Sequence, residues 1–185
     1  GRTYGLKGQM VENLERVINY RGSSPAIKDG FKQPSQTQLN KLINLLNKQL
    51  FEEALAEGQK LVREFPENSP ILNYIGAIKS KTGKDKEATK IFRKALKLQP
   101  DFAEVWSNLG NVYQSLNQLG RAKSAYQKAI VLKPNYAPAY NNYGVSLRGR
   151  VNKKQISLLF KRAINIEPGY SIAYYNLGAE VEDDK

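Results

Sequence analysis

A period of 34 residues in residue type is the feature that most constrains how this chain can fold. Glycine, proline and alanine return at this spacing, as Gly76, Gly110, Gly144 and Gly178, as Pro66, Pro100, Pro134 and Pro168, as Ala54, Ala88 and Ala122, and as Ala95, Ala129 and Ala163. A structural environment that repeats requires the same residue type at the same offset. The sequence therefore predicts an array of like units.

The pattern within residues 103–136 predicts two helices joined by a turn. Apolar and small residues spaced i, i+3, i+4 and i+7 fall on one face of a helix. The first such stripe consists of Trp106, Leu109, Gly110 and Tyr113, and the second of Ala122, Tyr126, Ala129 and Ile130. Pro134 ends the second helix because proline has no amide hydrogen and clashes with the preceding turn. Each unit is thus expected to be a hairpin of a first and a second helix.

The regular glycines indicate where the two helices of a hairpin approach each other. Glycine inside a helix costs about 1 kcal/mol relative to alanine, so a glycine kept in successive first helices must be offset by packing. We expect each first helix to contact its own second helix at this glycine, where the side chain nearly vanishes.

These residues, at these offsets, resemble the tetratricopeptide repeat (TPR) family. The family has Trp, Leu, Gly, Tyr, Ala, Phe, Ala and Pro at fixed positions, which are matched by Trp106, Leu109, Gly110, Tyr113, Ala122, Tyr126, Ala129 and Pro134. The resemblance extends over most of the chain. It implies an all-α fold, a right-handed α-α superhelix (TPR solenoid) of about four and a half helical hairpins.

The period divides the chain into frames. The expected segments are a leader helix and linker at 1–34, a degenerate TPR 1 at 35–68, TPR 2 at 69–102, TPR 3 at 103–136, TPR 4 at 137–170, and a first helix at 171–185. The leader helix, Met10–Arg21, is either loosely attached or docked on the first repeat. The last segment is either a capping helix or the start of a truncated TPR 5, and Gly178 favours the truncated repeat because this glycine suits a second helix.

Two frames depart from the pattern. In the first frame, Leu42 stands where the glycine belongs and Gly58 replaces the aromatic residue of the second helix. In the fourth frame, Ile156 replaces the small alanine. This larger side chain predicts a wider separation of the two helices or a local twist of that hairpin.

Composition excludes several kinds of chemistry. The sequence contains no cysteine and no histidine, so disulfides, thiol nucleophiles and the commonest general base are excluded. Glu52, Glu53 and Glu57 cluster without a partner and indicate a solvated helix face, and the acidic residues after Ala179 indicate an acidic tail rather than a metal site. We expect no enzymatic activity, no cofactor and no metal. No apolar run could span a membrane and no signal peptide is recognisable, which predicts a cytoplasmic protein without a membrane partner.

A column of amide side chains is the candidate binding site. Stacked hairpins curve, and their first helices line a concave groove. One offset on the side of the first helix away from the packing stripe is occupied by Asn40, Tyr74, Asn108, Asn142 and Asn176. An asparagine amide offers a donor and an acceptor that match those of a peptide bond. The column resembles the asparagine ladder of the O-linked N-acetylglucosamine transferase repeats, although Tyr74 interrupts it. The alternative is that these asparagines only solvate the helices.

Neighbouring offsets complete the predicted groove. Its other members are Asn73, Ser107, Asn111, Gln114, Asn141 and Arg148. This lining is polar and mostly uncharged. Chaperone-binding relatives that clamp a C-terminal carboxylate carry lysine and arginine at such offsets, and most of these are absent here. The sequence therefore disfavours a chaperone tail as the ligand.

Two functions remain open. The first is a protein-protein interaction scaffold that binds an extended peptide or partner protein in the concave groove. Its resemblance to bacterial TPR arrays that precede sulfotransferase or glycosyltransferase domains implies a catalytic domain elsewhere in the same full-length chain. The alternative is RNA binding by the convex face, because the net charge is +12 and lysines gather on second helices. Against it, the aromatic residues occupy core offsets rather than positions suited to stack on bases.

Overall fold

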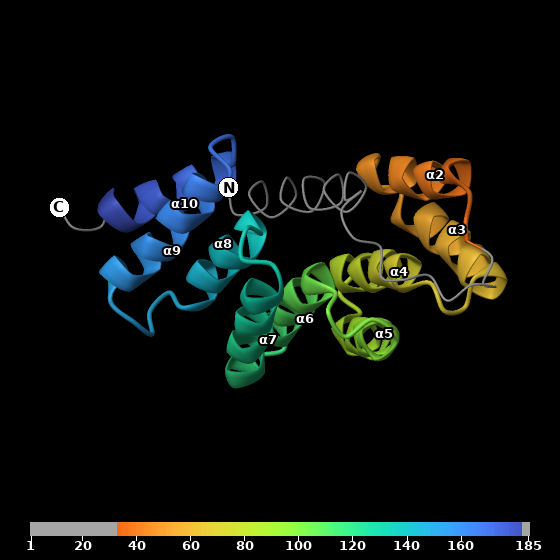
Figure 1. The fold of residues 1–185 in the computed structure, drawn as a ribbon, viewed down its shortest axis with the longest axis horizontal. Coiled ribbons are helices and arrows are strands. Elements are labelled where there is room, and N and C mark those ends of the chain that lie inside the picture. The colour runs from red at the N-terminus through yellow and green to blue at the C-terminus, as the bar shows by residue number, and fades with distance from the viewer. Residues whose placement is uncertain (1–32, 183–185) are drawn as a thin grey trace. The chain divides into compact units, whose positions relative to one another are not determined.

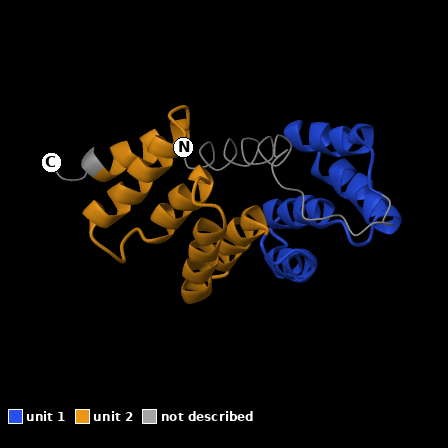
Figure 2. Ribbon diagram, viewed as in Figure 1, with its two compact units in different colours: residues 1, 3–101 blue, residues 2, 102–185 orange. Residues whose placement is uncertain are grey.

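The computed structural model describes residues 33–182, which form two compact helical units (Figures 1 and 2). The first unit ends at Asp101 and contains α2 (Gln36–Asn47), α3 (Phe51–Glu64), α4 (Ser69–Lys81) and α5 (Asp85–Leu98). The second begins at Phe102 and contains α6 (Ala103–Ser115), α7 (Leu119–Leu132), α8 (Ala137–Ser146), α9 (Lys153–Ile166) and α10 (Ser171–Glu182). The predicted leader helix, Met10–Arg21, lies outside the described residues, as do Asp183 and Asp184 of the acidic tail.

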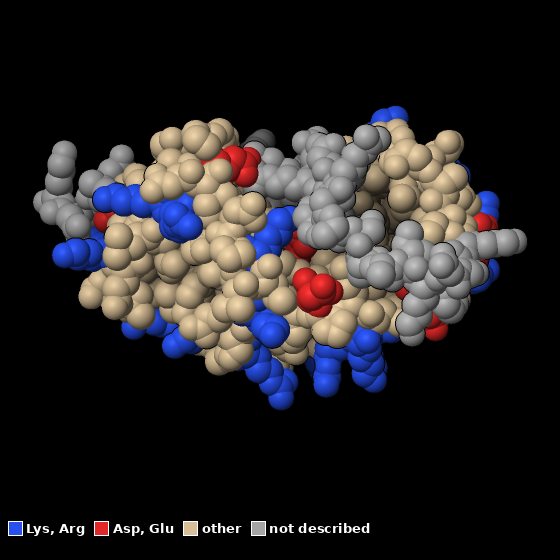
Figure 3. Space-filling model, in the orientation of Figure 1, with Lys and Arg blue, Asp and Glu red and all other residues tan. Residues whose placement is uncertain are grey.

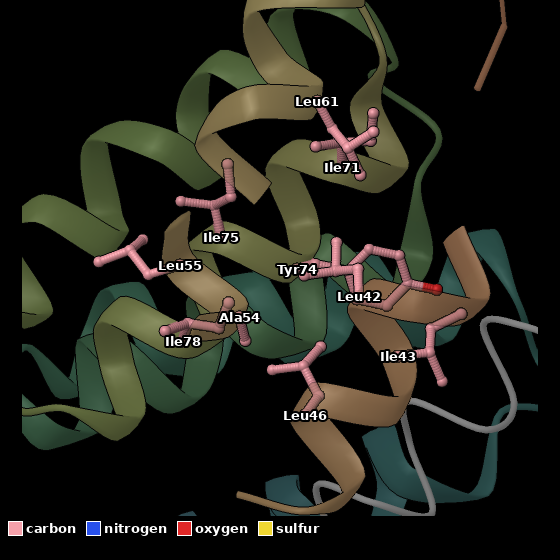
Figure 4. Packing of buried hydrophobic residues seen from close by; sticks show 10 residues of the cluster. All are labelled: Leu42, Ile43, Leu46, Ala54, Leu55, Leu61, Ile71, Tyr74, Ile75 and Ile78. Atoms are coloured by element: carbon pink, nitrogen blue, oxygen red, sulfur yellow. The ribbon is translucent and has the colours of Figure 1, made fainter. Parts of the chain in front are cut away.

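The first unit stacks its four helices in chain order, each against the next. Polar caps start two of them: the Ser35 hydroxyl accepts from the Gln38 amide at 3.2 Å, and the Asn68 side chain accepts from the Ile71 amide at 3.0 Å. Figure 4 shows the apolar core between α2, α3 and α4. Leu42 and Leu61 are fully buried within it.

The second unit repeats this arrangement with five helices. Each helix packs on the next, and α8 also contacts the first helices before and after it, α6 and α10. The largest fully buried side chains of the unit are aromatic, namely Tyr126, Phe160 and Tyr170. Within residues 33–182 every regular element is a helix. The predicted all-α class is therefore confirmed.

The close approach at the regular glycines is also confirmed. A Cβ atom placed on Gly110 would lie 2.6 Å from Cε1 of Tyr126. The equivalent distances are 2.5 Å from Gly76 to Cε1 of Phe92 and 2.7 Å from Gly144 to Cε1 of Phe160. Because these distances are too short for any real side chain, the aromatic ring of each second helix occupies the space that glycine leaves on the first.

The departure in the first hairpin is a reversal of this arrangement. A Cβ atom on Gly58 would lie 2.9 Å from Cγ1 of Ile75 and 3.8 Å from Cδ1 of Leu42. Leu42 itself is fully buried. The large side chain is thus on the first helix and the glycine on the second, so the hairpin again pairs one large residue with one small one.

The fourth hairpin differs in its turn. Gln49, Gly83 and Asn117 stand 34 residues apart and have positive φ angles of 59°, 76° and 55°. The next residue at this offset is Val151, whose β-branched side chain disfavours a positive φ. Gly149 has a φ of 72° instead, and α8 is 10 residues long where α6 has 13. The local irregularity therefore lies in the turn; the wider separation expected from Ile156 stays a prediction.

Candidate functional site

The predicted amide column divides between the two units. In the first unit, Asn40 of α2 is exposed and its Oδ1 accepts from Gln36 Nε2 at 2.8 Å. Tyr74 of α4 is 3% exposed, and burial raises the pKa of its hydroxyl. In the second unit, Asn108 of α6 is half-buried, whereas Asn142 and Asn176 are buried. The offset therefore provides environments that differ from repeat to repeat.

The buried amides of the second unit bond to one another. Nδ2 of Asn176 donates to Oδ1 of Asn141 at 2.8 Å, and Nδ2 of Asn141 donates to Oδ1 of Asn142 at 3.3 Å. These bonds connect α10 to α8. Sequence reasoning placed all three side chains on an open groove, but their bonded atoms hold two first helices together.

Arg148 extends this network at one end. Its Nη2 donates to Oδ1 of Asn176 at 3.1 Å and to the main-chain oxygen of Asn176 at 3.3 Å, and its Nε donates to Oε1 of Glu180 at 2.6 Å. The guanidinium also lies 5.4 Å from the centroid of the Phe160 ring. Arg148 thus lies where the sequence placed it, but an acidic partner already balances its charge.

One predicted groove offset lies inside the packing. Asn73, Ser107 and Asn141 are 34 residues apart and are exposed by 1%, 1% and 0%. The bond from Asn141 to α10 explains the burial of the last of them, since this offset on α8 meets the next first helix. Polar residues at this offset are short because they fit between helices.

Asn111 and Gln114 of α6 are the predicted residues that remain accessible. Asn111 is exposed and Gln114 is half-buried. The Tyr126 hydroxyl donates to Oδ1 of Asn111 at 2.8 Å and lies 3.0 Å from Oε1 of Gln114. Burial raises the pKa of Tyr126, so this hydroxyl remains a donor at neutral pH. The bonds fix both amides by their oxygens, and the amide nitrogens take no part in them.

Sequence reasoning missed the role of Tyr126, which it placed in the core. The ring does pack on Gly110, and Tyr126 is fully buried. The signal was available in the repeat itself, because the two neighbouring frames carry Phe92 and Phe160 at this offset and only Tyr126 adds a hydroxyl.

The cations noted on second helices lie on the surface. Lys86, Lys90, Arg93, Lys94 and Lys97 of α5 are all exposed. Figure 3 shows lysine and arginine side chains projecting from the region of α5 and α7. Other basic groups pack on rings: Arg121 lies 5.9 Å from the Tyr113 ring centroid. No helix among residues 33–182 is both long enough and apolar enough to cross a membrane.

Comparison with known proteins identifies the repeat. A family model described as tetratricopeptide repeat matches residues 103–136, and one described as TPR repeat matches residues 76–117. The comparison with curated proteins gave no match.

Several solved structures share the fold. A thermophilic TPR protein of Thermus thermophilus has a TM-score of 0.73 at 18% identity, with 80% of this chain and 81% of that one covered. An O-GlcNAc transferase mutant of Thermobaculum terrenum has a TM-score of 0.63 at 17% identity, covering 89% of this chain and 27% of that one. The first TPR of Spaghetti (RPAP3), bound to an HSP90 peptide, has a TM-score of 0.57 at 22% identity, covering 62% and 91%. Residues 76–136 therefore belong to the tetratricopeptide repeat family, and the helical hairpins on either side of them share its all-α fold.

Proposed function

We propose that the chain is a protein-interaction scaffold that binds an extended segment of a partner protein along the first helices of its second unit. The TPR fold supports this function, since one structural neighbour, the first TPR of Spaghetti, was solved with a peptide bound. The Asn108 side chain, together with Asn111 and Gln114, would contact the ligand from α6. The bonded amides of α8 and α10 would hold the neighbouring first helices in register.

The observation that carries the proposal is the bond from the buried Tyr126 hydroxyl to Asn111 and its 3.0 Å approach to Gln114. A side chain whose oxygen is already held loses less conformational freedom when its nitrogen donates to a ligand. Two such amides, one helical turn apart, suit successive carbonyl groups of an extended main chain. Each hydrogen bond contributes about 1 kcal/mol net, so we expect weak binding that needs additional contacts.

The charge balance of the second unit indicates an internal segment rather than an acidic terminus. Arg148 is paired with Glu180 at 2.6 Å, and Lys133 is paired with Glu104 at 2.6 Å. A carboxylate ligand would have to displace these partners. The peptide bound to Spaghetti is acidic, with the sequence SRMEEVD, and we propose that the ligand of this chain differs from it in charge.

A peptide array tests the proposal. Short synthetic peptides of varied sequence, each with a free and an amidated C-terminus, would be probed with the labelled chain. Selected peptides would then be titrated by fluorescence anisotropy against the Asn111→Ala/Gln114→Ala variant. Gln127→Ala is the matched control, because Gln127 is an exposed amide on the second helix α7.

We expect the double variant to weaken binding about tenfold, the control to bind like the parent chain, and amidation of the peptide to make no difference. Binding that requires the free carboxylate, or that survives the double variant unchanged, would contradict the proposed site. The associated catalytic domain, the lack of enzymatic activity and the cytoplasmic location remain predictions from the sequence.

A further inference from the structure

α10 presents a stripe of residues that other first helices bury. Ser171, Tyr174, Tyr175 and Gly178 are spaced i, i+3, i+4 and i+7, and all four are exposed. Tyr174 is 49% exposed and Tyr175 is 74% exposed. No atom lies within 4 Å of a Cβ position built on Gly178.

The equivalent stripes of α6 and α8 are covered. Ser107 and Asn141, which share an offset with Tyr175, are exposed by 1% and 0%. Gly110 and Gly144, which share an offset with Gly178, each meet the aromatic ring of the following second helix. The exposed stripe of α10 is therefore the surface on which α7 and α9 pack in the two preceding hairpins.

We propose that this stripe is a docking surface for one amphipathic helix of a partner protein, with Phe or Tyr at its centre. The helices that fill the equivalent surfaces define the required pattern. In α5 and α7 the aromatic residue has an alanine four positions before it and another three positions after it, as Ala88, Phe92 and Ala95 and as Ala122, Tyr126 and Ala129. All six are buried to 1% exposure or less. The ring enters the space above the glycine, and the alanines let the two helix backbones approach.

The first hairpin shows how the partner helix is selected. There the first helix carries Leu42, and the helix packed on it carries Gly58. A glycine on the first helix thus accepts a ring, and a leucine accepts a glycine. Gly178 assigns α10 to the first kind, and the exposed rings of Tyr174 and Tyr175 add the apolar area with polar tips that is common in protein interfaces.

A crossed pair of substitutions tests the docking surface. The probe is a fluorescein-labelled peptide of residues 118–134, which contains α7, and its Tyr126→Gly form. Each peptide is titrated by anisotropy against the full chain, its Gly178→Leu variant and the control Gly120→Leu. Gly120 is the matched control because it also has no atom near its Cβ position but lies on the second helix α7.

We expect the parent chain and the control to bind the tyrosine peptide at least about tenfold more tightly than the glycine peptide. Gly178→Leu should reverse or remove this preference. Equal affinity for the two peptides, or a preference that survives Gly178→Leu, would overturn the proposal.

Sedimentation equilibrium of the unliganded chain separates a second possibility. If the parent chain dimerises and Gly178→Leu makes it monomeric, the surface accepts a second copy of the chain and the assignment to a different protein is wrong. We expect both chains to be monomers. Circular dichroism verifies that the variants keep their helices, which Gly178→Leu should preserve because the site is exposed.

Discussion

At the scale of single residues, the stability of each hairpin depends on one large and one small side chain that face each other. Gly110 leaves a gap that the Tyr126 ring fills, with 2.6 Å between the Cβ position and Cε1. We predict that Gly110→Leu lowers the free energy of unfolding by about 1 to 3 kcal/mol or more, because the added side chain overlaps the ring. Urea denaturation measures the change. Gly120→Leu, at an open position, should leave the stability nearly unchanged.

A second substitution distinguishes overlap from a loss of helix packing in general. The pair Gly110→Leu/Tyr126→Gly reproduces the arrangement of Leu42 and Gly58 in the first hairpin. We predict that this double variant is more stable than Gly110→Leu alone in the same denaturation experiment. A double variant that is less stable than Gly110→Leu would show that the exchange seen in the first hairpin depends on its other neighbours.

The hydroxyl of Tyr126 predicts a dependence of stability on pH. Burial raises the pKa of Tyr126 in the folded chain above its ordinary value of 10.0. The folded state therefore resists deprotonation, and the stability is fully present below about pH 10 and is lost as the pH rises above it. We predict that Tyr126→Phe declines less steeply between neutral and alkaline pH than the parent chain. At neutral pH the same variant should lose about 0.5 to 1.5 kcal/mol with its hydrogen bond to Asn111. Equal slopes in the two chains would contradict this role.

At the scale of helices and turns, the repeat is kept by a residue in the left-handed region after each first helix. Gln49, Gly83 and Asn117 take this conformation at one offset, and Gly149 takes it two residues early. We predict that Gly149→Ala costs roughly 1 to 2 kcal/mol, because a Cβ atom is strained at a φ of 72°. The control is Gly169→Ala, where φ is not positive and the space is open. Equal unfolding free energies for the two variants would show that the turn of the fourth hairpin relaxes without strain.

The sequence predicted the helices better than the turns and the polar contacts. Periodic stripes determine which face of a helix is buried, and the glycines identified where two helices touch. Asp85 was expected to cap α5, but Lys84 precedes that helix and the Asp85 carboxylate accepts from the Ser80 hydroxyl at 3.1 Å. A capping residue depends on backbone angles that no period encodes. The bonds among Asn141, Asn142 and Asn176 were missed for a related reason: an amide can bond to a neighbouring helix as readily as to a ligand.

At the scale of the whole molecule, the charge is distributed unevenly along the chain. The frames 69–102 and 137–170 each carry a net charge of +5, whereas 35–68 carries −1. Several cations of the second unit are already engaged, such as Arg148 with Glu180 and Lys133 with Glu104. On α5, by contrast, five cations are exposed on one helix, with Glu87 bonded to Lys79 of α4 at 2.8 Å. This excess would attract polyanions without selecting among them.

The exposed cations lead to a prediction for nucleic acid. We expect single-stranded RNA to bind with micromolar or weaker affinity, because lysines contact phosphates without regard to sequence while Phe92, Tyr126 and Phe160 are fully buried and cannot stack on bases. Titration of labelled RNA at two salt concentrations measures both the affinity and its dependence on salt. Lys90→Ala/Lys94→Ala should reduce the residual binding at low salt, while the Asn111→Ala/Gln114→Ala variant should not. Tight binding with a steep salt dependence would favour RNA binding over peptide binding as the function of the chain, since a scaffold for uncharged peptide segments has no need of such affinity.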